Sequence, residues 1–579
     1  MSLNFRQFQS AGQISSHIIP GAYSRIDSVK GAVGLAAANN GVIMGKCRGG
    51  KPATLLQFNT VAEAVAALRS GDLMEAVRLA FAPGGGVNPQ RLFAMRVNSA
   101  IQGSVDLDDI TPDTMITLTS RDYGIYVNQI KVILATSSDT YGKKLTVQFK
   151  TDPDEVFDNI RRQSFAIEYT DAACTMTIVN NSGAQTLVTS VGGLSINLND
   201  YPTIGDLAAY INDQTDFTCT PIAGQEDAAP LELDAVDAQD INTAEYITES
   251  TFQAIIDTVN AGSARLSAAA TNAANDRVIP ENLALTYLTS GSEGTYVAGD
   301  WTDALTALEA ENIQFVATPD DDVEVSGPHA AIKTHCEAMS AVTGRKERQF
   351  LVGAPWKTDV MATEITAAIA ASKALNSKNG LYAFNGGTQY DVNGVIQNYG
   401  GCYAACMLMG IKCALAINQP LTFKDLNFIA LEWKLTDSNL ENLLKNGVAA
   451  INYAPNGIPR LVRQFNTYQT NDLKWNEFSV VTEMFYASRD LRTYLEDLFV
   501  GQPGVSITGG VLRGAVEGRL ANYVDLGIFV MNPSTGLAWW NVQITISSDT
   551  VYVDYDAYVT LPVNFEFIVS HFHELVATL

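Results

Sequence analysis

The run Gly45–Pro52, which reads GKCRGGKP, is the part of this chain that comes nearest to a phosphate-binding loop. Its GxxxxGK spacing follows a short apolar stretch, and such loops hold phosphates with backbone N–H groups. Magnesium-dependent phosphate chemistry also needs a Ser or Thr hydroxyl directly after the lysine, and Pro52 stands there. We therefore expect a glycine-rich turn at this position and no nucleotide site.

Thiol and imidazole ligands are few and poorly spaced for a metal. Cys402, Cys406 and Cys413 share one face of a predicted helix, but a thiolate zinc site needs closer pairs and a fourth ligand. His571 and His573 lie on the same side of a predicted strand, which gives only two imidazoles. We expect the cysteines to be buried small side chains, and we expect no metal or cofactor.

Acid–base and nucleophilic catalysis have few candidate residues. The chain has five His and no GxSxG nucleophile elbow, and Asp320–Asp322 lacks the spacing and the glycine of a calcium loop. We expect no enzymatic activity. Because distant residues can assemble a catalytic site, a nucleotide-dependent enzyme on the α/β part of the chain stays open as the main alternative.

The two ends of the chain favour self-assembly. Met1–Ile19 is mostly polar and has too few apolar side chains for a core, and Pro20-Gly21 follows it. The last forty residues instead alternate as strands do. An extended arm at one end and available strand edges at the other suit strand exchange between copies. We therefore expect a structural protein, with a capsid or baseplate component as a second alternative.

Helices alternate with short apolar strands over much of the chain, which is typical of a largely parallel, doubly wound sheet. Predicted strands include Gly41–Gly45, Ile313–Ala317 and Leu381–Phe384, and the predicted helix Asn476–Phe499 is the longest. The fold class we predict is α/β and α+β multidomain. It comprises a doubly wound α/β trunk, an inserted β-rich domain, and a C-terminal α+β domain completed by strand exchange between subunits.

Charge marks out the insertion. The net charge of the chain is -25, and residues 101–245 hold 23 acidic and 7 basic residues, with no Lys or Arg from Gln163 to Ala264. Such self-repulsion suits a solvated outer surface and disfavours nucleic-acid binding. Glu226–Asp240 reads as a polar connector. The predicted division is an arm over 1–24, trunk over 25–100 and 246–440, an outer domain over 101–245, and a C-terminal domain over 441–579.

Nothing in the sequence predicts membrane insertion or secretion. Tyr403–Asn418 is the best candidate for a membrane span, but it is shorter than the ~20 residues that a span needs and it contains Lys412. The N-terminus has no apolar signal region, and seven Cys without CxxC spacing are typical of a reducing compartment. We expect a buried helix and synthesis in the cytoplasm.

Several segments resemble the contractile tail sheath proteins of bacteriophages, which are related to the sheaths of R-type pyocins and of type VI secretion. Pro20-Gly21-Ala22-Tyr23 is similar to the short PG-x-Y start of that family. The segments that carry the rest of the likeness are Gly41–Val97, Thr289–Asp320 (TSGSEGTYVAGDWTDALTALEAENIQFVATPD), Gln349–Pro355 (QFLVGAP), Gly447–Asn466, Arg489–Phe499 (RDLRTYLEDLF) and Val551–Ile568. Residues 101–245 lie outside it.

The resemblance implies a subunit of hexameric rings that stack helically around an inner tube and contract to drive the tube through the host envelope. The implied partners are further copies of the chain, the tail tube protein, and baseplate and tail terminator proteins. The implied location is the virion, after assembly in the host cytoplasm. Type VI sheaths are usually built from two chains, so one long chain with an insertion fits a phage tail better.

In that family the N-terminal arm and the C-terminal segment add strands to neighbouring subunits, and an arm of ~20 residues reaches ~65 Å when extended. Flexible connections would let the domains rotate while copies stay joined. The predicted arm contacts are Phe5, Phe8, Ile14, Ile18 and Ile19. The predicted C-terminal interface residues are Val551, Val553, Tyr555, Val563, Phe565, Phe567 and Val569. The candidates for tube contact are Arg489, Arg492, Glu496 and Asp497.

Overall fold

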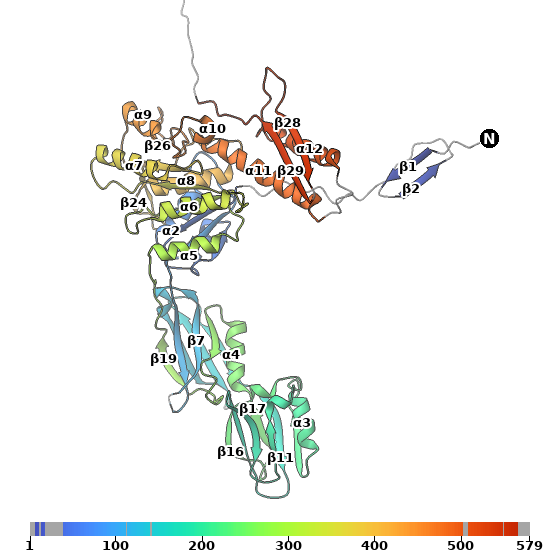
Figure 1. Cartoon of the computed structure of the whole chain (residues 1–579). Helices are drawn as coiled ribbons and strands as arrows, with labels where there is room; N and C mark the ends of the chain where they lie inside the picture. Colours follow the sequence, from blue (N-terminus) through green and yellow to red (C-terminus); the bar gives the residue numbers. More distant parts are fainter. Residues whose placement is uncertain are drawn as a thin grey trace, which may run out of the picture.

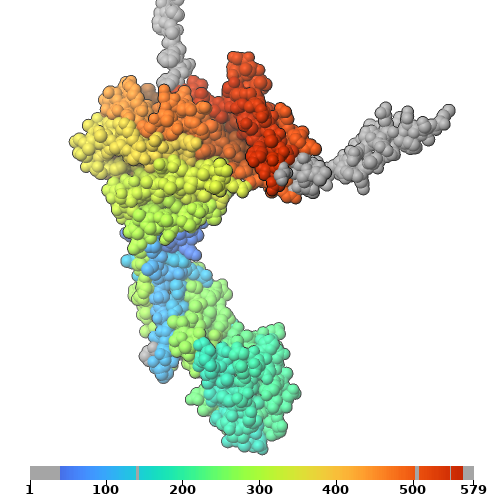
Figure 2. Space-filling view, in the orientation of Figure 1, coloured from blue at the N-terminus to red at the C-terminus, as the bar shows by residue number. Residues whose placement is uncertain are grey.

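The computed structural model describes residues 39–111, 113–138, 142–501, 508–547 and 549–564, together with the backbone of 6–10 and 13–17. The chain forms a central trunk, an inserted region in two parts that we call the proximal and distal bodies, and a smaller C-terminal body (Figure 1). In Figure 2 the inserted region projects from one end of the trunk as a narrow column, and the distal body forms its far end.

An eight-stranded sheet organises the trunk, and its interior strands run parallel as the sequence predicts. Only the two edge strands, β27 and β4, pair antiparallel with their neighbours. In spatial order the strands are β27 (Pro459–Leu461), β26 (Val448–Tyr453), β22 (Gly380–Phe384), β21 (Gln349–Gly353), β20 (Phe315–Ala317), β3 (Gly41–Gly45), β5 (Leu92–Arg96) and β4 (Leu55–Phe58).

Helices cover both faces of this sheet, which is why its central strands read as continuous apolar runs. Side chains alternate between two cores: Ile43 lies in one, and Val42 and Met44 lie in the other. The first face carries α1 (Val61–Leu68), α2 (Asp72–Phe81) and α8 (Gly401–Ala414). The second carries α5 (Ala298–Leu308), α6 (Pro328–Ser340), α7 (Met361–Leu375) and α9 (Asp437–Lys445).

A small three-stranded sheet accompanies the trunk, formed by β24 (Ile396–Tyr399), β23 (Gly387–Tyr390) and β25 (Ala430–Leu431). The segment Tyr403–Asn418 was expected to be a buried helix. Its residues up to Ala414 belong to the buried trunk helix α8, and the rest lie beyond the end of that helix. None of the described helices is long and apolar enough to cross a membrane.

The proximal body is made from chain on both sides of the distal body, so one insertion is nested in another. Its first part contributes β6 (Gln102–Asp108), β7 (Thr114–Tyr123), β8 (Ile130–Thr136), β9 (Lys143–Phe149) and β10 (Glu155–Ile160). Its second part contributes α4 (Thr251–Gly262), β18 (Leu266–Ala270) and β19 (Leu283–Tyr287). These elements share one hydrophobic core.

The structure therefore places residues 246–288 with the insertion, whereas the sequence prediction ends the insertion at 245. The reason is that the prediction followed the acidic charge, while the packing follows the apolar face of α4, where Phe252, Ile255 and Val259 are buried with β8 and β9. The expected polar connector Glu226–Asp240 also differs in part, because β16 (Val236–Asp240) pairs with β12 (Thr175–Asn181).

The distal body holds two sheets and one helix. One sheet has the order β15 (Phe217–Pro221), β11 (Gln163–Tyr169) and β17 (Tyr246–Glu249). The other has the order β14 (Ser195–Asn197), β13 (Ala184–Thr189), β12 and β16. Helix α3 (Ile204–Asn212) packs against β15, and a single hydrophobic core joins both sheets.

The C-terminal body begins later than the predicted residue 441, because α9, β26 and β27 complete the trunk sheet and its second face. After the short α10 (Leu473–Asn476), the body contains α11 (Phe478–Phe499), α12 (Gly509–Asp525) and a hairpin of β28 (Trp539–Ser547) and β29 (Thr550–Ala557). Between α12 and the hairpin, Phe529 forms a single bridge with Val559.

Part of the predicted N-terminal arm forms a hairpin. β1 (Arg6–Ser10) pairs antiparallel with β2 (Gln13–His17), from Arg6 opposite His17 to Ser10 opposite Gln13. The hydrogen-bonding groups between the two strands are therefore satisfied within the arm. Because an isolated two-stranded hairpin is marginally stable in water, this unit needs further strands to persist.

A buried cation in the trunk makes its stability depend on pH. Arg348 is fully buried beside β21, and its guanidinium donates to the carbonyls of Leu308 (2.9 Å) and Glu311 (2.6 Å) and to Nε2 of His335. Burial and the neighbouring Arg348 charge lower the pKa of His335 to about 4. Protonated His335 would place two cations in contact, so the folded trunk keeps this imidazole neutral.

We predict that the trunk loses stability as the pH falls from 7 to 5 and that His335→Gln removes part of this loss. The folded pKa of His335 is about 4 and its ordinary value is 6.5, so the unfolded chain binds the proton first. The loss attributable to His335 is about 2 kcal/mol of unfolding free energy between these pH values. Glutamine keeps an acceptor for Arg348 but does not titrate. Urea unfolding at both pH values measures the difference, and an equal loss in parent and variant would contradict the assignment.

Candidate functional site

The glycine-rich run after β3 is a turn without a phosphate site. Pro52 bridges to Arg96, and the chain continues into the edge strand β4, whereas a phosphate loop leads into a helix. Lys46 of this run forms ion pairs with Asp72 (3.5 Å) and Glu324. The expectation of a glycine-rich turn is confirmed.

A cavity of about 270 Å³ lies where the strand order of the trunk reverses, at the carboxyl ends of β3 and β20. Ligands of open α/β sheets bind at such a point. Here the lining includes the carboxylates of Asp72, Asp320, Asp321 and Glu324, and Lys46 is the one cation among the described lining residues. The resulting negative potential opposes nucleotide phosphates.

The cysteines and histidines form no metal site in the part of the chain that is described. Cys402 and Cys406 are buried in α8 and Cys413 is partly buried, as expected of small core side chains. The described residues contain no group of three or more His, Cys, Asp or Glu side chains that could hold a metal ion. His571 and His573 lie outside the described residues.

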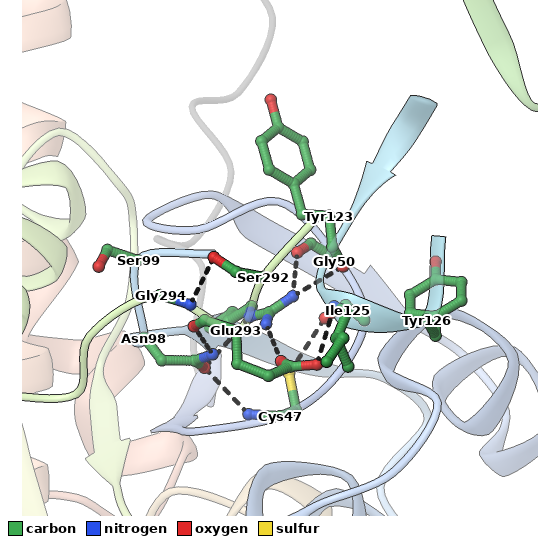
Figure 3. A network of polar contacts seen from close by, with 12 residues as sticks. Cys47, Gly50, Asn98, Ser99, Tyr123, Ile125, Tyr126, Ser292, Glu293 and Gly294 are labelled. Carbon is green, nitrogen blue, oxygen red and sulfur yellow. Dashed lines mark hydrogen bonds and ion pairs between the residues drawn. The ribbon is translucent and has the colours of Figure 1, made fainter. Parts of the chain in front are cut away.

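A buried arginine fixes the inserted region to the trunk. Arg96, at the end of β5, is fully buried, and its guanidinium donates to the carbonyls of Gly50 and Tyr123 (both 3.1 Å), to Oδ1 of Asn98 (3.1 Å) and to Oε2 of Glu293 (2.6 Å). Figure 3 shows Asn98 and Glu293 side by side in this network. Gly50 belongs to the trunk, Tyr123 ends β7 of the proximal body, and Glu293 lies on the returning chain, so one side chain joins all three.

Further hydrogen bonds among its neighbours reinforce this joint. Asn98 Nδ2 donates to the Glu293 carbonyl (2.9 Å), and its Oδ1 accepts from the Cys47 N–H (3.1 Å). Glu293 Oε1 accepts from the N–H of Ile125 (3.1 Å) in the proximal body. Since a buried guanidinium is tolerated only when its donors are paired, this set of contacts holds a single geometry.

The two chain segments that cross the joint are also paired with each other. Ser99 N–H donates to Thr295 (3.1 Å) and Ile101 N–H donates to Ser292 (2.9 Å). Gly294 has φ +65, and a Cβ there would lie 1.8 Å from the Ser99 carbonyl oxygen. The crossing is therefore a closely packed two-stranded connection.

One helix is shared between the trunk and the C-terminal body. At its start, Phe478 is buried in the trunk core, and Gln349 of β21 donates to the Phe478 carbonyl (3.1 Å) while accepting from the Thr482 hydroxyl (2.6 Å). Further along the same helix, Tyr486 and Leu491 lie in the core of the C-terminal body. Because α11 is continuous, the two bodies cannot rotate against each other without breaking it.

A buried ion pair holds the second helix of the C-terminal body to the first. Arg519 of α12 donates from Nε (2.6 Å) and Nη2 (2.8 Å) to both oxygens of Asp490 in α11. The Tyr523 hydroxyl donates to Asp490 Oδ2 (2.7 Å). Two parallel bonds from a guanidinium to a carboxylate fix orientation as well as distance, so α11 and α12 form one unit.

The candidates for tube contact lie mostly at the joint between α11 and the trunk. Arg492 donates to both Glu347 oxygens (2.8 Å each), and Arg489 donates to the Glu347 carbonyl (3.4 Å). Glu496 forms an ion pair with Arg345. Asp497 is exposed. Three of the four charges thus have partners within the subunit, and contact with a tube stays a prediction.

The terminal hairpin extends beyond the helices that cover it. On its inner face Val542 is buried, and Ile544 and Val553 pack against the C-terminal core. The next cross-strand pair on that face, Ile546 and Val551, is 45% and 38% exposed. Within the described residues no third strand pairs with either edge of this hairpin. An apolar overhang with open edges is a surface that a further strand or chain can cover.

The other predicted interface residues are divided between described and undescribed parts of the chain. Tyr555 is partly buried against the C-terminal core, and Val563 is 89% exposed and outside any strand. Phe8 lies in β1 and Ile14 in β2. The residues outside the described part are Phe5, Ile18, Ile19, Phe565, Phe567 and Val569.

The joints themselves were missed from the sequence. Arg96 and Glu293 are 197 positions apart, and Asp490 and Arg519 are 29 apart, so no local spacing links either pair. The one local signal was an arginine at the end of an apolar strand, in RLFAMRV. A charge at such a position requires a buried partner, although it does not indicate which one.

Residues 294–467 match the family described as the phage tail sheath protein central domain, and the match begins where the chain returns to the trunk. The tail sheath protein of Bacillus phage SP01 is 25% identical over 585 residues, which covers 96% of this chain and 95% of that protein. The putative tail sheath protein of Enterococcus phage phiEF24C is 26% identical over 514 residues, which covers 83% and 84%.

Two solved structures share the fold at 12% identity. The sheath tail protein of Desulfitobacterium hafniense has a TM-score of 0.52 and covers 93% of this chain and 96% of its own. The sheath tail protein of Listeria innocua has a TM-score of 0.55 and covers 90% and 93%. The resemblance predicted from the sequence is thus confirmed: residues 294–467 match the central domain of phage tail sheath proteins, and 96% of the chain is similar to one such protein.

Proposed function

We propose that this chain is the structural subunit of a contractile phage tail sheath. Copies polymerise as stacked hexameric rings around the tail tube, and contraction drives the tube through the host envelope. The observation that carries the proposal is the likeness to a tail sheath protein over 96% of the chain. The acidic switch-point cavity gives no support to the nucleotide-dependent alternative.

The internal joints support a mechanism in which each subunit moves as one body. The Arg96 network fixes the inserted region, and α11 fixes the C-terminal body, so a change between two packings of the same subunit takes place at the contacts between copies. Strands exchanged through the arm and the terminal hairpin keep copies joined during that change. β28 presents nine residues without a charge and is the edge best suited to receive a strand, whereas β29 carries Asp554 and Asp556.

Deletion of Met1–Ile19 should leave a folded chain that no longer forms tubes. The trunk and C-terminal cores, as the structure describes them, are built from residues outside this segment, so the melting temperature should stay within a few degrees of the parent. Electron microscopy of the purified proteins should show hollow striated cylinders for the parent and dispersed particles for the truncated chain. Cylinders from the truncated chain would refute a role for the arm, and shells or discs from the parent would favour a capsid or baseplate component.

A matched control separates strand pairing from chain length. Replacement of Met1–Ile19 by a Gly/Ser segment of equal length keeps the reach of the arm but removes side chains that select a register. This variant should also fail to assemble. If it formed cylinders, the arm would act as a spacer.

Charges on the inner face of the hairpin overhang should block assembly. Ile546→Asp with Val551→Asp places two carboxylates where we propose that a neighbour packs, and the critical concentration for polymerisation should rise at least roughly tenfold, which corresponds to about 1.4 kcal/mol. Thr545→Asp with Tyr552→Asp adds the same charge to the opposite face, at the adjacent cross-strand pair. Pelleting assays should show normal assembly for this control. Equal defects in the two variants would mean that the inner face has no special role.

A double-mutant cycle decides whether Arg492 acts within the subunit or on the tube. Arg492→Gln and Glu347→Gln should each weaken the α11 joint, and the coupling energy of the pair should be about 1 kcal/mol, since Glu347 is buried and Arg492 is partly exposed. Co-assembly with tube protein should fall equally in both single variants and no further in the double variant. Loss confined to Arg492→Gln would instead place Arg492 on the tube surface.

A further inference from the structure

The distal body has a large excess of acidic residues, which neither its packing nor the proposed assembly contacts explain. Between Gln163 and Ala264 the sequence has fifteen Asp and Glu residues and no Lys, Arg or His. Ten of the fifteen are exposed, and they are Asp171, Asp200, Asp206, Asp213, Asp216, Glu226, Asp227, Asp237, Asp240 and Glu245. A body of this charge repels a second copy of itself at short range.

Five of these ten carboxylates lie in or beside the edge strands of the two distal sheets. The inner strands β12 and β13 contain no charged residue, and the inner strand β11 contains only the half-buried Glu168. Each of the four edge strands has an exposed carboxylate within it or close to its end. These are Asp200 after β14, Asp216 before β15, Asp237 and Asp240 within β16, and Glu245 before β17.

The free edge of a sheet is a template for pairing with another chain, and charged side chains on edge strands are a general means of preventing it. The distal body is exposed to such pairing with other chains, because it lies at the far end of the projecting inserted region (Figure 2). Many copies in one assembly, or two assemblies in contact, would bring such edges together repeatedly. Every distal edge strand therefore has negative charge at a position where unwanted pairing would begin.

A second joint keeps the distal body in this projecting position. Asp234 of the distal body is buried and accepts from the N–H groups of Thr251 (2.7 Å) and Phe252 (3.0 Å) at the start of α4. Arg162 pairs with Glu232 (3.2 Å) and with Asp257 of α4 (2.6 Å). The distal edges are consequently held away from the trunk, and within the body part of the β15 edge is covered, where Asn212 pairs with the N–H and the carbonyl of Cys219 (both 2.7 Å).

We infer that the carboxylates on the edge strands of the distal body prevent edge-to-edge pairing between copies of this chain, so that copies join through their terminal segments only. Paired strands lie about 4.8 Å apart, which is well inside the Debye length of about 8 Å at physiological salt. Repulsion between two approaching acidic edges is therefore effective in the cell and is screened near 1 M salt, where the Debye length is about 3 Å.

The test is an edge variant of the full-length chain that removes one carboxylate from each edge strand. It combines Asp200→Asn, Asp216→Asn, Asp237→Asn and Glu245→Gln. Because no hydrogen bond or ion pair of these four side chains is found among the described residues, the melting temperature should not change. The NaCl concentration at which half of the protein sediments as irregular aggregate should fall roughly fivefold or more. Hydrogen exchange should show added protection in β15, β16 and β17 in that aggregate.

The matched control removes the same charge from the same body away from the edge strands, and it combines Asp171→Asn, Asp213→Asn, Glu226→Gln and Asp227→Asn. It should stay dispersed over the same salt range as the parent. Equal aggregation of both variants would show that total charge, and not its placement, keeps copies apart. An edge variant as soluble as the parent would overturn the inference outright.

The inference goes beyond the proposed function and can be tested separately from it. The same salt series on chains that lack Met1–Ile19 compares edge and control variants whether or not tubes form. Failure of the parent to form cylinders would count against the sheath proposal alone. Failure of the edge variant to aggregate would count only against the proposed role of the carboxylates on the distal edge strands.

Discussion

The continuity of α11 is the constraint on which the rest of this structure depends. A helix of 22 residues has its first turns in the trunk core and its later turns in the C-terminal core, so neither core is complete without it. Rotation of one body against the other would break backbone hydrogen bonds and expose both cores at once. Because such a break would expose apolar side chains of both cores, we expect the subunit to move as one unit at this joint.

The Arg96 network joins the inserted region to the trunk as α11 joins the C-terminal body, but through polar groups. A fully buried guanidinium is strongly unfavourable unless every donor is satisfied, and here the partners come from the trunk, the proximal body and the returning chain together. Removing Glu293 leaves a buried charge uncompensated, and removing a carbonyl partner leaves a buried N–H unpaired, so the three segments stay together or come apart together. Polar burial of this kind adds little net stability and mainly selects one geometry for the projecting insertion.

The sequence predicted those parts of the fold whose signals are local. β3, β20 and β22 were found because both of their faces are buried, which leaves unbroken apolar runs. The helix Asn476–Phe499 was found from its spacing, although a break at Glu477 separates α10 from α11. The tail sheath resemblance came from the order of several such segments along the chain.

The misses share one cause, which is that pairing across long separations leaves no mark on local composition. The acidic pattern predicts that the insertion ends at residue 245, whereas Phe252 and Val259 belong to its hydrophobic core. The interface residues were chosen by alternation, which cannot distinguish Val553, used by its own core, from Val551, which projects beyond it. Arg489 and Arg492 looked available because Glu347 lies far away in the sequence.

This chain has strand edges that must pair with other copies and strand edges that must not, and the position of charged residues distinguishes the two. An assembly built by strand exchange must keep at least one edge receptive, and β28 is uncharged along its whole length and borders an apolar overhang. The same chain exposes four further edges in the distal body, and each has a carboxylate in it or beside it. If all six edges of these sheets and the hairpin were equally receptive, copies would join in many registers and directions, and a closed ring would compete with irregular aggregates. Charging the distal edges removes those alternatives without any cost to the hairpin. The acidic insertion and the terminal segments are then two halves of one requirement, because exchange at the termini is useful only where pairing elsewhere is suppressed.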